Sequence, residues 1–205
     1  MKLIDAIENR TSVRSFTNEK VKTEDIREMV RRGGLAPSVN NFQPWNFILI
    51  NKKEILDELA VLISDKYKAI EFKDVRAKEN IKKQVEWYST FFKEAPALLV
   101  LTMSEYETVL EKGSQMTHRE INEMRGFPDI QSAGACIQNV LLSAVEMGYG
   151  ACWLSGPMIA KEEIHERLGL SEKENLICFV AIGRPSKEFT PKKKEDLGSK
   201  LQILD

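Results

Sequence analysis

Cysteine and histidine are scarce in this chain, which limits the chemistry that it can carry. The 205 residues include three cysteines and two histidines. Cys136, Cys152 and Cys178 lie far apart, each in an apolar segment where a free thiol packs as a small hydrophobe. No Cys-x-x-Cys pair occurs, so a zinc ribbon or an iron–sulfur cluster would lack its ligands. We therefore expect no metal site, and free thiols in a reducing, cytoplasmic compartment.

Neither histidine stands in a spacing that suits a metal or a protease-like site. A serine or cysteine nucleophile would need one of them as its base. His165 follows Ile164 on a charged helical segment and is expected to face water. The polar surroundings of His118 leave its role open. The sequence therefore gives no support for nucleophilic catalysis.

Excess charge, long apolar runs and glycine-rich nucleotide motifs are also missing. There are 30 basic and 31 acidic residues, a net charge of −1, which argues against nucleic-acid binding. The apolar stretches are too short to span a membrane, and the charged start Met1–Asp5 is unlike a signal peptide. No Gly-x-Gly-x-x-Gly or Walker-type loop, internal repeat or linker is present. We expect one domain over residues 1–205 and no membrane contact.

The segment Arg10-Thr-Ser-Val-Arg14 places two guanidiniums and a hydroxyl at alternate positions. Alternate side chains of an extended chain point to one side, so Arg10, Ser12 and Arg14 would converge. Arginine matches phosphate oxygens with two parallel hydrogen bonds, and the set suits a phosphate. A solvated basic turn is the alternative, and these five residues alone do not exclude it.

A second polar segment, Ala36 to Trp45, contains two prolines and two asparagines, which rule out a regular element. Such a loop lets the backbone approach a ligand and offers amide donors and acceptors. The alternative is a plain surface turn. Phe42 and Trp45 argue against it, because two large aromatic side chains need to be covered.

Hydrophobic periodicity predicts helices interleaved with buried strands. The predicted strands are residues 45–50, 97–103, 149–155 and 176–182. The predicted helices are residues 3–9, 23–33, 52–67, 71–94, 130–147 and 159–168. Thr23 is expected to cap the second helix, and Gly169 to end the last.

The segment Ile130–Met147 contains one charged side chain, Glu146, in 18 residues. A helix that is apolar nearly all round is buried on all sides. We expect it to form the centre of the domain or to be shared with a second subunit, with Leu141 in the buried seam.

Two polar regions lack a core pattern. Residues 104–125 carry mixed charge and His118, and we interpret them as a lid or excursion, with a mobile surface insertion as the equal alternative. Residues 186–205 form an extended tail that contains Lys192-Lys-Lys194.

In their order along the chain, these segments resemble the nitroreductase family of FMN flavoproteins. Arg10–Phe16, and Ala36-Pro-Ser38 with Asn41-x-Gln43-Pro-Trp45, look like its two N-terminal signatures. Gln131–Trp153 resembles the central dimer helix and following strand, and Ala181–Pro185 the last core strand. The resemblance implies an α+β fold, with a mixed sheet flanked by helices, built as an intertwined homodimer with two FMN sites at the subunit interface.

Carried over by position, the resemblance implies an FMN site made from four parts of the chain. Arg10, Ser12 and Arg14 would hold the phosphate. The loop that reaches the flavin of the other subunit would contribute Pro37, Ser38, Asn41 and Gln43. The turn against the flavin ring edge would contribute Leu154, Ser155 and Gly156, and the tail would return Lys192 or Lys194 to the phosphate.

The resemblance also implies the chemistry. FMN would take hydride from NADH or NADPH and pass electrons to a small-molecule acceptor, nitroaromatic or quinone-like, by a ping-pong mechanism. The cofactor carries the chemistry, so no catalytic side chain is expected. Other flavin chemistry (dehalogenation, enoyl reduction or flavin fragmentation) and FMN binding without turnover are the alternatives.

Overall fold

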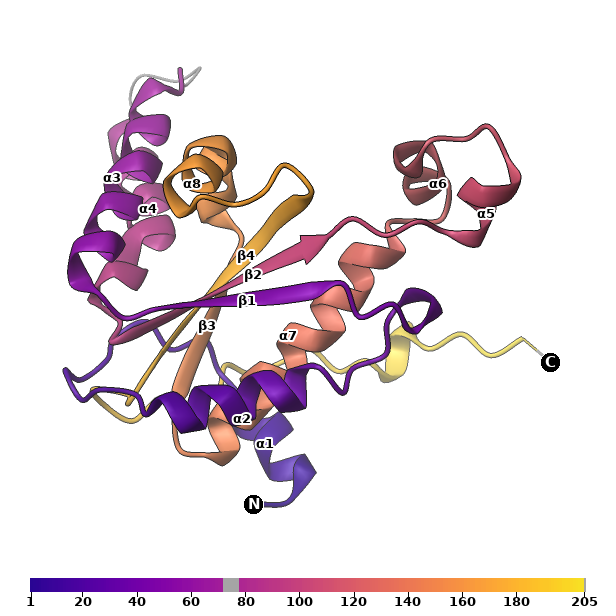
Figure 1. Ribbon diagram of the computed structural model, residues 1–205. Helices are drawn as coiled ribbons and strands as arrows, with labels where there is room; N and C mark the ends of the chain where they lie inside the picture. Colours follow the sequence, from indigo (N-terminus) through magenta and orange to yellow (C-terminus); the bar gives the residue numbers. More distant parts are fainter. Residues whose placement is uncertain (72–77, 205) are drawn as a thin grey trace.

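The computed structural model describes residues 1–71 and 78–204. Within them, four antiparallel strands form one sheet in the order β1-β2-β4-β3 (Figure 1). The strands are β1 (Trp45–Ile50), β2 (Ala97–Ser104), β3 (Gly150–Leu154) and β4 (Glu174–Gly183). The expected α+β class is confirmed. The strands pair antiparallel, and the parallel component of the predicted mixed sheet is the isolated bridge between Ser12 and Ala151.

Helices cover both faces of this sheet (Figure 1). The α-helices are α1 (Leu3–Asn9), α2 (Thr23–Gly33), α3 (Lys53–Ala69), α4 (Lys78–Thr90), α5 (Val109–Gly113), α6 (His118–Met124), α7 (Pro128–Glu146) and α8 (Lys161–Leu168). The 3-10 turns are η1 (Val39–Asn41), η2 (Phe91–Glu94), η3 (Gly156–Ala160) and η4 (Gly198–Lys200). Among the described residues, no helix is both long enough and apolar enough to cross a membrane.

Alternate residues of the central strands enter two separate cores. Leu98 and Val100 of β2 face α3, η2 and α8, where Phe92 meets Phe179 edge-on at 5.3 Å between ring centroids. Leu99 and Leu101 face α2 and α7 on the other side. Burial on both faces explains why β2 reads as a continuous apolar run instead of an alternating one.

Helix α7 packs closely against α2 and is less enclosed than its sequence suggests. A Cβ at Gly33 would lie 2.7 Å from Val140, so only glycine permits this approach. Along α7, Leu141 is buried in the chain's own core, whereas Ile130 and Gln138 are exposed. The single chain does not bury this helix on all sides, so a helix shared with a second subunit stays a prediction, while Leu141 itself lies in the core of one subunit.

The N-terminal segment reaches the outer edge of β3. Ser12 bridges Ala151, and the Val13 N–H donates to the Ala151 carbonyl at 3.1 Å. A Cβ at Gly150 would lie 2.7 Å from Val13, which makes glycine necessary at this contact. This bridge fixes the Arg10–Arg14 segment beside β3.

The structure corrects two local expectations. Thr23 is the first residue of α2, and Lys22 occupies the cap position without a side-chain hydrogen bond. His165 faces water only in part, because it is half-buried and its Nε2 donates to the Ser171 carbonyl at 3.0 Å, in the loop that folds back after α8. Gly169 ends α8 with a φ of 63°, as expected. Part of the predicted helix 71–94 lies outside the described residues.

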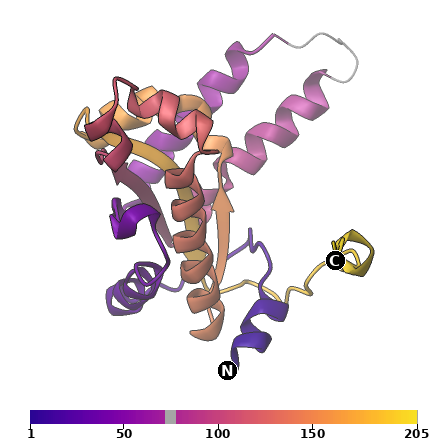
Figure 2. The same ribbon diagram turned by 90° about the vertical axis from the view of Figure 1, so that its right-hand side faces the viewer.

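The excursion and the tail both leave the body of the molecule. Residues 104–125 form α5 and α6, which stand apart from the sheet at one side of Figure 1. Each begins with a reciprocal cap, made by Thr108 with Glu111 and by Thr117 with Glu120. The tail after Pro185 runs away from the sheet toward the C-terminus (Figure 2).

Candidate functional site

One cleft brings together the phosphate residues expected from the first motif and from the tail. Arg10, Ser12 and Arg14 line it together with Lys192 and Lys194. Its volume is about 450 Å³, within the range of roughly 300–1,000 Å³ typical of small-molecule sites. Trp87 and Tyr88 of α4 form a further part of its wall.

The cleft is strongly cationic. Its wall carries five basic side chains, and none of them forms an ion pair with a carboxylate among the described residues: Arg10, Arg14, Lys187, Lys192 and Lys194. The Arg14 guanidinium lies 5.2 Å from the Tyr88 ring centroid, a cation–π distance. Such uncompensated charge favours an anionic ligand.

The thiol nearest this charge is not a nucleophile. Burial raises the pKa of Cys152, and its contact with Ser12 and the charges of Arg14 and Arg10 oppose this only in part. The thiol stays protonated near neutral pH. A protonated, buried thiol is a poor nucleophile.

The turn after β3 presents backbone to solvent. The Leu154 side chain is buried in the core, while Ser155 is exposed. The Leu154 side chain is therefore not available to a ligand. From Ala151 to Ser155 the edge of β3 extends about 13 Å at the usual rise per residue, which links the cationic cleft with this turn.

Buried hydrogen bonds hold the turn in place. The Ser89 hydroxyl donates to Tyr67 Oη at 2.9 Å, and Tyr67 donates to the Gly156 carbonyl at 3.2 Å. A Cβ at Gly156 would lie 2.3 Å from the Ser89 hydroxyl. Glycine is thus required where α4 approaches the turn.

The loop containing Pro37, Ser38, Asn41 and Gln43 does not line the cationic cleft. It is closed on itself, because Ser38 Oγ accepts the Gln43 N–H at 3.0 Å and the Gln43 amide donates to Asn41 Oδ1 at 3.1 Å. Asn41 and Gln43 have φ values of 54° and 53°. This left-handed backbone conformation costs free energy in any residue that carries a side chain. In a single chain, this loop and the cleft are separate.

Sequence reasoning missed a second polar cavity, of about 700 Å³, between the excursion and the ends of β2 and β4. Tyr106, His118 and Asn122 are part of its wall. His118 and Asn122 stand four residues apart, on one face of α6. That spacing was the available signal, and it is weak without knowledge of the fold around it.

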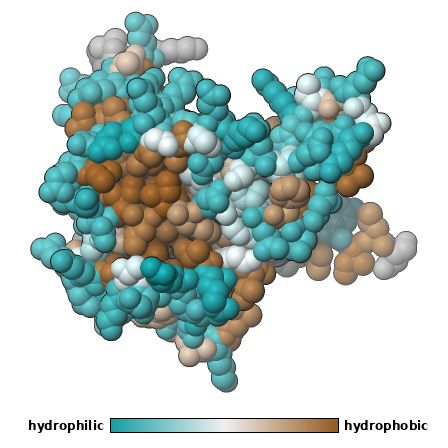
Figure 3. Space-filling view, in the orientation of Figure 1, coloured by the Kyte–Doolittle hydropathy of each residue, from teal (hydrophilic) through white to brown (hydrophobic). Residues whose placement is uncertain are grey.

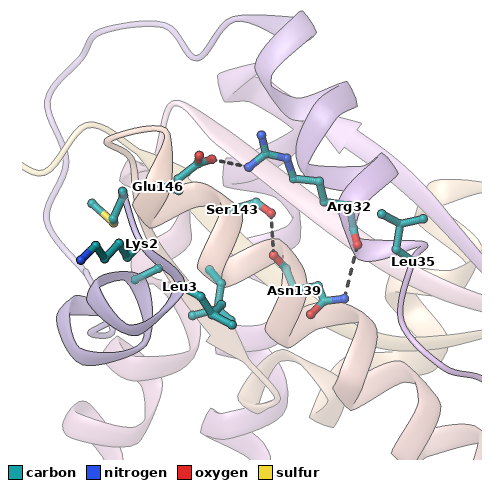
Figure 4. Close-up of a pocket in the computed structure, with 10 residues that line it drawn as sticks. Lys2, Leu3, Arg32, Leu35, Asn139, Ser143 and Glu146 are labelled. Carbon is teal, nitrogen blue, oxygen red and sulfur yellow. Dashed lines mark hydrogen bonds and ion pairs between the residues drawn. The ribbon is translucent and has the colours of Figure 1, made fainter.

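A third cleft, of about 350 Å³, is apolar and lies where α1 and α2 meet α7 (Figure 4). Leu3 and Leu35 line it and are each 70% exposed. Arg32 and Glu146 form an ion pair beside it. Exposed leucines around a cleft indicate a surface suited to an apolar partner.

Residues 7–184 match the family model described as "Nitroreductase family". The chain belongs to the nitroreductase family. Membership of this family makes the protein an oxidoreductase, and relatives carry names of that kind. The match covers the cleft residues Arg10, Ser12 and Arg14 but stops before the tail lysines.

Solved structures share the fold over the whole chain. A BluB-like flavoprotein from Clostridium difficile 630 superposes with a TM-score of 0.89 and 30% identity, covering 100% of both chains. A nitroreductase with bound FMN from Desulfitobacterium hafniense DCB-2 gives a TM-score of 0.75 with 21% identity over 100% of both chains. The second likeness concerns the fold alone.

Among curated proteins, the putative NAD(P)H nitroreductase YfhC of Bacillus subtilis is 24% identical over 196 residues, which are 94% of this chain and 89% of that protein. Iodotyrosine deiodinase 1 of Homo sapiens is 24% identical over 189 residues, 91% of this chain. The chain spans only 62% of the length of this deiodinase.

Proposed function

We propose that the protein binds FMN in the cationic cleft and passes electrons from NADH or NADPH to a small-molecule acceptor, nitroaromatic or quinone-like, by a ping-pong mechanism in the cytoplasm. The observation that carries this proposal is the convergence of Arg10, Ser12 and Arg14 with two tail lysines on one cleft. The tail lysines lie 178 or more positions after Arg14, so their meeting with the first motif is a property of the fold.

The residues of the cleft fit the FMN phosphate. A phosphomonoester carries roughly −1.5 to −2 charges near neutral pH. Two guanidiniums can each bind it with paired hydrogen bonds, and the lysines add point charges. Because no described carboxylate neutralises these cations, the anion does not have to displace an internal ion pair.

The outer edge of β3 offers the other half of the site. Beyond the bridge at Ala151, this edge faces no further strand among the described residues. It leads to the backbone of Leu154, Ser155 and Gly156, which we propose contacts the flavin ring edge. Trp87 is 52% exposed and gives the cleft an apolar wall that can exclude water.

Bound FMN would supply the two-electron redox chemistry. The chain's part is to bind the cofactor, orient it and stabilise negative charge on it through fixed cations and backbone donors. This chemistry requires no histidine or cysteine to transfer protons. Because burial raises its pKa, the Cys152 thiol stays neutral, which is compatible with a site that has no cysteine nucleophile.

We further propose a homodimer in which the loop Pro37–Gln43 of one subunit completes the FMN site of the other. Support comes from the separation of this loop from the cleft within one chain. Apolar surface is also exposed to solvent. Figure 3 shows a brown patch over the sheet, and β1, which carries the half-buried Phe47 and Leu49, is an edge strand of that sheet. The tail exposes Leu201 and Leu204. A second copy would cover such surfaces.

Anaerobic mixing of FMN-loaded protein with NADH, and separately with NADPH, tests the function. We expect rapid loss of the visible flavin absorption with the preferred donor, and its return when a nitroarene or quinone is added. Flavin that stays oxidised with both donors would identify an FMN-binding protein without turnover and contradict the proposal.

Reductive dehalogenation is a second candidate, supported by the deiodinases among the relatives. Adding iodotyrosine to the reduced protein distinguishes the two, because a dehalogenase releases iodide and reoxidises the flavin. Flavin fragmentation has its own signature: after reduction and admission of air, the visible absorption would not return. In a reductase that leaves its flavin intact, the visible absorption returns when air is admitted.

A further inference from the structure

We propose that the cavity between the excursion and the sheet binds a small, flat, uncharged molecule that carries an N–H donor beside a carbonyl acceptor, with Asn122 and Tyr106 as its partners. Its wall includes Met103, Tyr106, His118, Asn122, Phe127 and Ile177, and also carries charged side chains of both signs. It is separate from the cationic cleft, since the two share no lining residue. The proposal therefore does not depend on the FMN assignment.

A chain of polar contacts fixes the orientation of Asn122. Its amide nitrogen lies 3.0 Å from Asp129 Oδ2, and a carboxylate only accepts, so the –NH₂ group faces Asp129. The same nitrogen lies 2.8 Å from His118 Nε2, which therefore accepts its second hydrogen. His118 Nδ1–H then donates to Glu111 Oε1 at 2.9 Å.

This arrangement leaves two buried oxygens without a hydrogen bond. Asn122 Oδ1 and Tyr106 Oη find no partner among the described residues, although each side chain is only 6% exposed. Burial raises the pKa of Tyr106, and the Asp129 carboxylate adds to this, so the phenol keeps its proton. The Asn122 amide oxygen thus needs a hydrogen-bond donor, and the Tyr106 hydroxyl can donate a hydrogen bond to an acceptor. Buried polar groups of native proteins are rarely left in this state.

The two oxygens are covered, and the backbone that joins the excursion to α7 is strained. Both oxygens are covered in this conformation, so a ligand must shift the side chains around them. Gly126 and Phe127, which join α6 to α7, have φ values of 70° and 56°. A left-handed phenylalanine stores backbone strain at this joint. Figure 1 shows α5 and α6 standing away from the sheet, connected to β2 at one end and through this joint to α7 at the other.

The chemistry of the walls selects the ligand. A carboxamide or lactam supplies both an N–H donor for Asn122 Oδ1 and a carbonyl acceptor for the Tyr106 O–H. The Tyr106 and His118 rings meet edge-on at 5.0 Å and favour a planar body. The acidic lining residues Glu105 and Asp129 are balanced by the basic Arg119 and Lys161, so the wall favours neither sign of charge. Phe42 lies 5.0 Å from the Tyr106 ring, so an occupant would also contact the region of the loop that we place at the partner's flavin site.

Benzamide is the probe, titrated into the purified holoprotein and followed by ligand-observed NMR. We expect a dissociation constant of about millimolar, as for other small fragments. Acetophenone and benzoate, which both lack the N–H donor, should bind at least about fivefold more weakly. Equal binding of all three would contradict the proposed partners.

Two matched tyrosines complete the test. Tyr106→Phe should weaken benzamide binding about fivefold or more while leaving the melting temperature unchanged or higher, because no internal hydrogen bond is lost. Tyr67→Phe should leave benzamide binding unchanged but lower the melting temperature, because Tyr67 bonds to Ser89 and Gly156. Unchanged affinity in Tyr106→Phe, or a melting temperature that falls as in Tyr67→Phe, would overturn the proposal.

Discussion

Arg14 is the single residue on which the phosphate assignment depends most. Arg14→Ala removes a paired, charge-assisted contact of about 1.5–3 kcal/mol. We predict that FMN binds about tenfold or more weakly, while riboflavin, which lacks the phosphate, is affected little. Fluorescence titration with both ligands measures this. Arg31→Ala is the control, since Arg31 is paired with Glu28 on α2, away from the cleft. If the affinities for FMN and riboflavin fall equally, Arg14 does not contact the phosphate.

Glu28 gives a prediction about acid stability. Hydrogen bonds from Arg31 and Arg32 lower its pKa from 4.5 to about 2. Because the folded state holds this proton less tightly than the unfolded state, the stabilisation is present above pH 4.5 and is lost as the pH falls toward 2. In urea unfolding, the stability difference between wild type and Glu28→Gln should shrink across this window. A difference that is independent of pH would show that the pairing does not persist in solution.

Sequence reasoning located single residues better where the chain is locally ordered than where distant segments meet. The alternation in Arg10–Arg14 predicts that Arg10, Ser12 and Arg14 share one side, and all three line one cleft, although the five residues alone do not exclude a solvated turn. The pattern predicts Leu141 in a subunit seam, but this residue lies in the core of its own chain. His165 was expected in water, but a loop folds back onto it. Neither contact has a signal in the local pattern.

The excursion formed by α5 and α6 is predicted to control which electron acceptor the protein uses. Replacing residues 108–124 with a short Gly–Ser linker should change the KM for the electron acceptor while FMN stays bound, because the cationic cleft uses no residue of this segment. Steady-state kinetics with a nitroarene and a quinone, together with the flavin content, measure both effects. Loss of FMN with an unchanged acceptor preference would show that the segment is not a lid.

The elements themselves were largely predictable. All four strands and α7 lie within a few residues of their predicted ranges, since burial on both faces gives long apolar runs. The strand order β1-β2-β4-β3 was not predictable, because pairing is decided by contacts between distant segments. The internal structure of residues 104–125 was missed as well, although both reciprocal caps there are visible in the sequence as Thr108-x-x-Glu111 and Thr117-x-x-Glu120.

For the whole molecule, the exposed leucines of the α1–α2–α7 cleft test the proposed homodimer. Burying one leucine stabilises by about 1.5–3 kcal/mol, so the double variant Leu3→Asp with Leu35→Asp should weaken dimerisation at least about hundredfold. The monomer should keep its circular dichroism spectrum, since both side chains are 70% exposed. Val61→Asp on α3, 57% exposed, is the matched control. A double variant that stays dimeric would place the interface elsewhere.

The shared FMN site is the central claim, and size-exclusion chromatography with light scattering and visible absorbance tests it most directly. If FMN binds only the assembled site, flavin binding and dimerisation stabilise each other by mass action. At about micromolar concentration, we expect one yellow peak with the mass of a dimer and one flavin per chain, because FMN binding and dimerisation are linked. A flavin-loaded monomer, or a colourless protein that does not take up added FMN, would contradict the account.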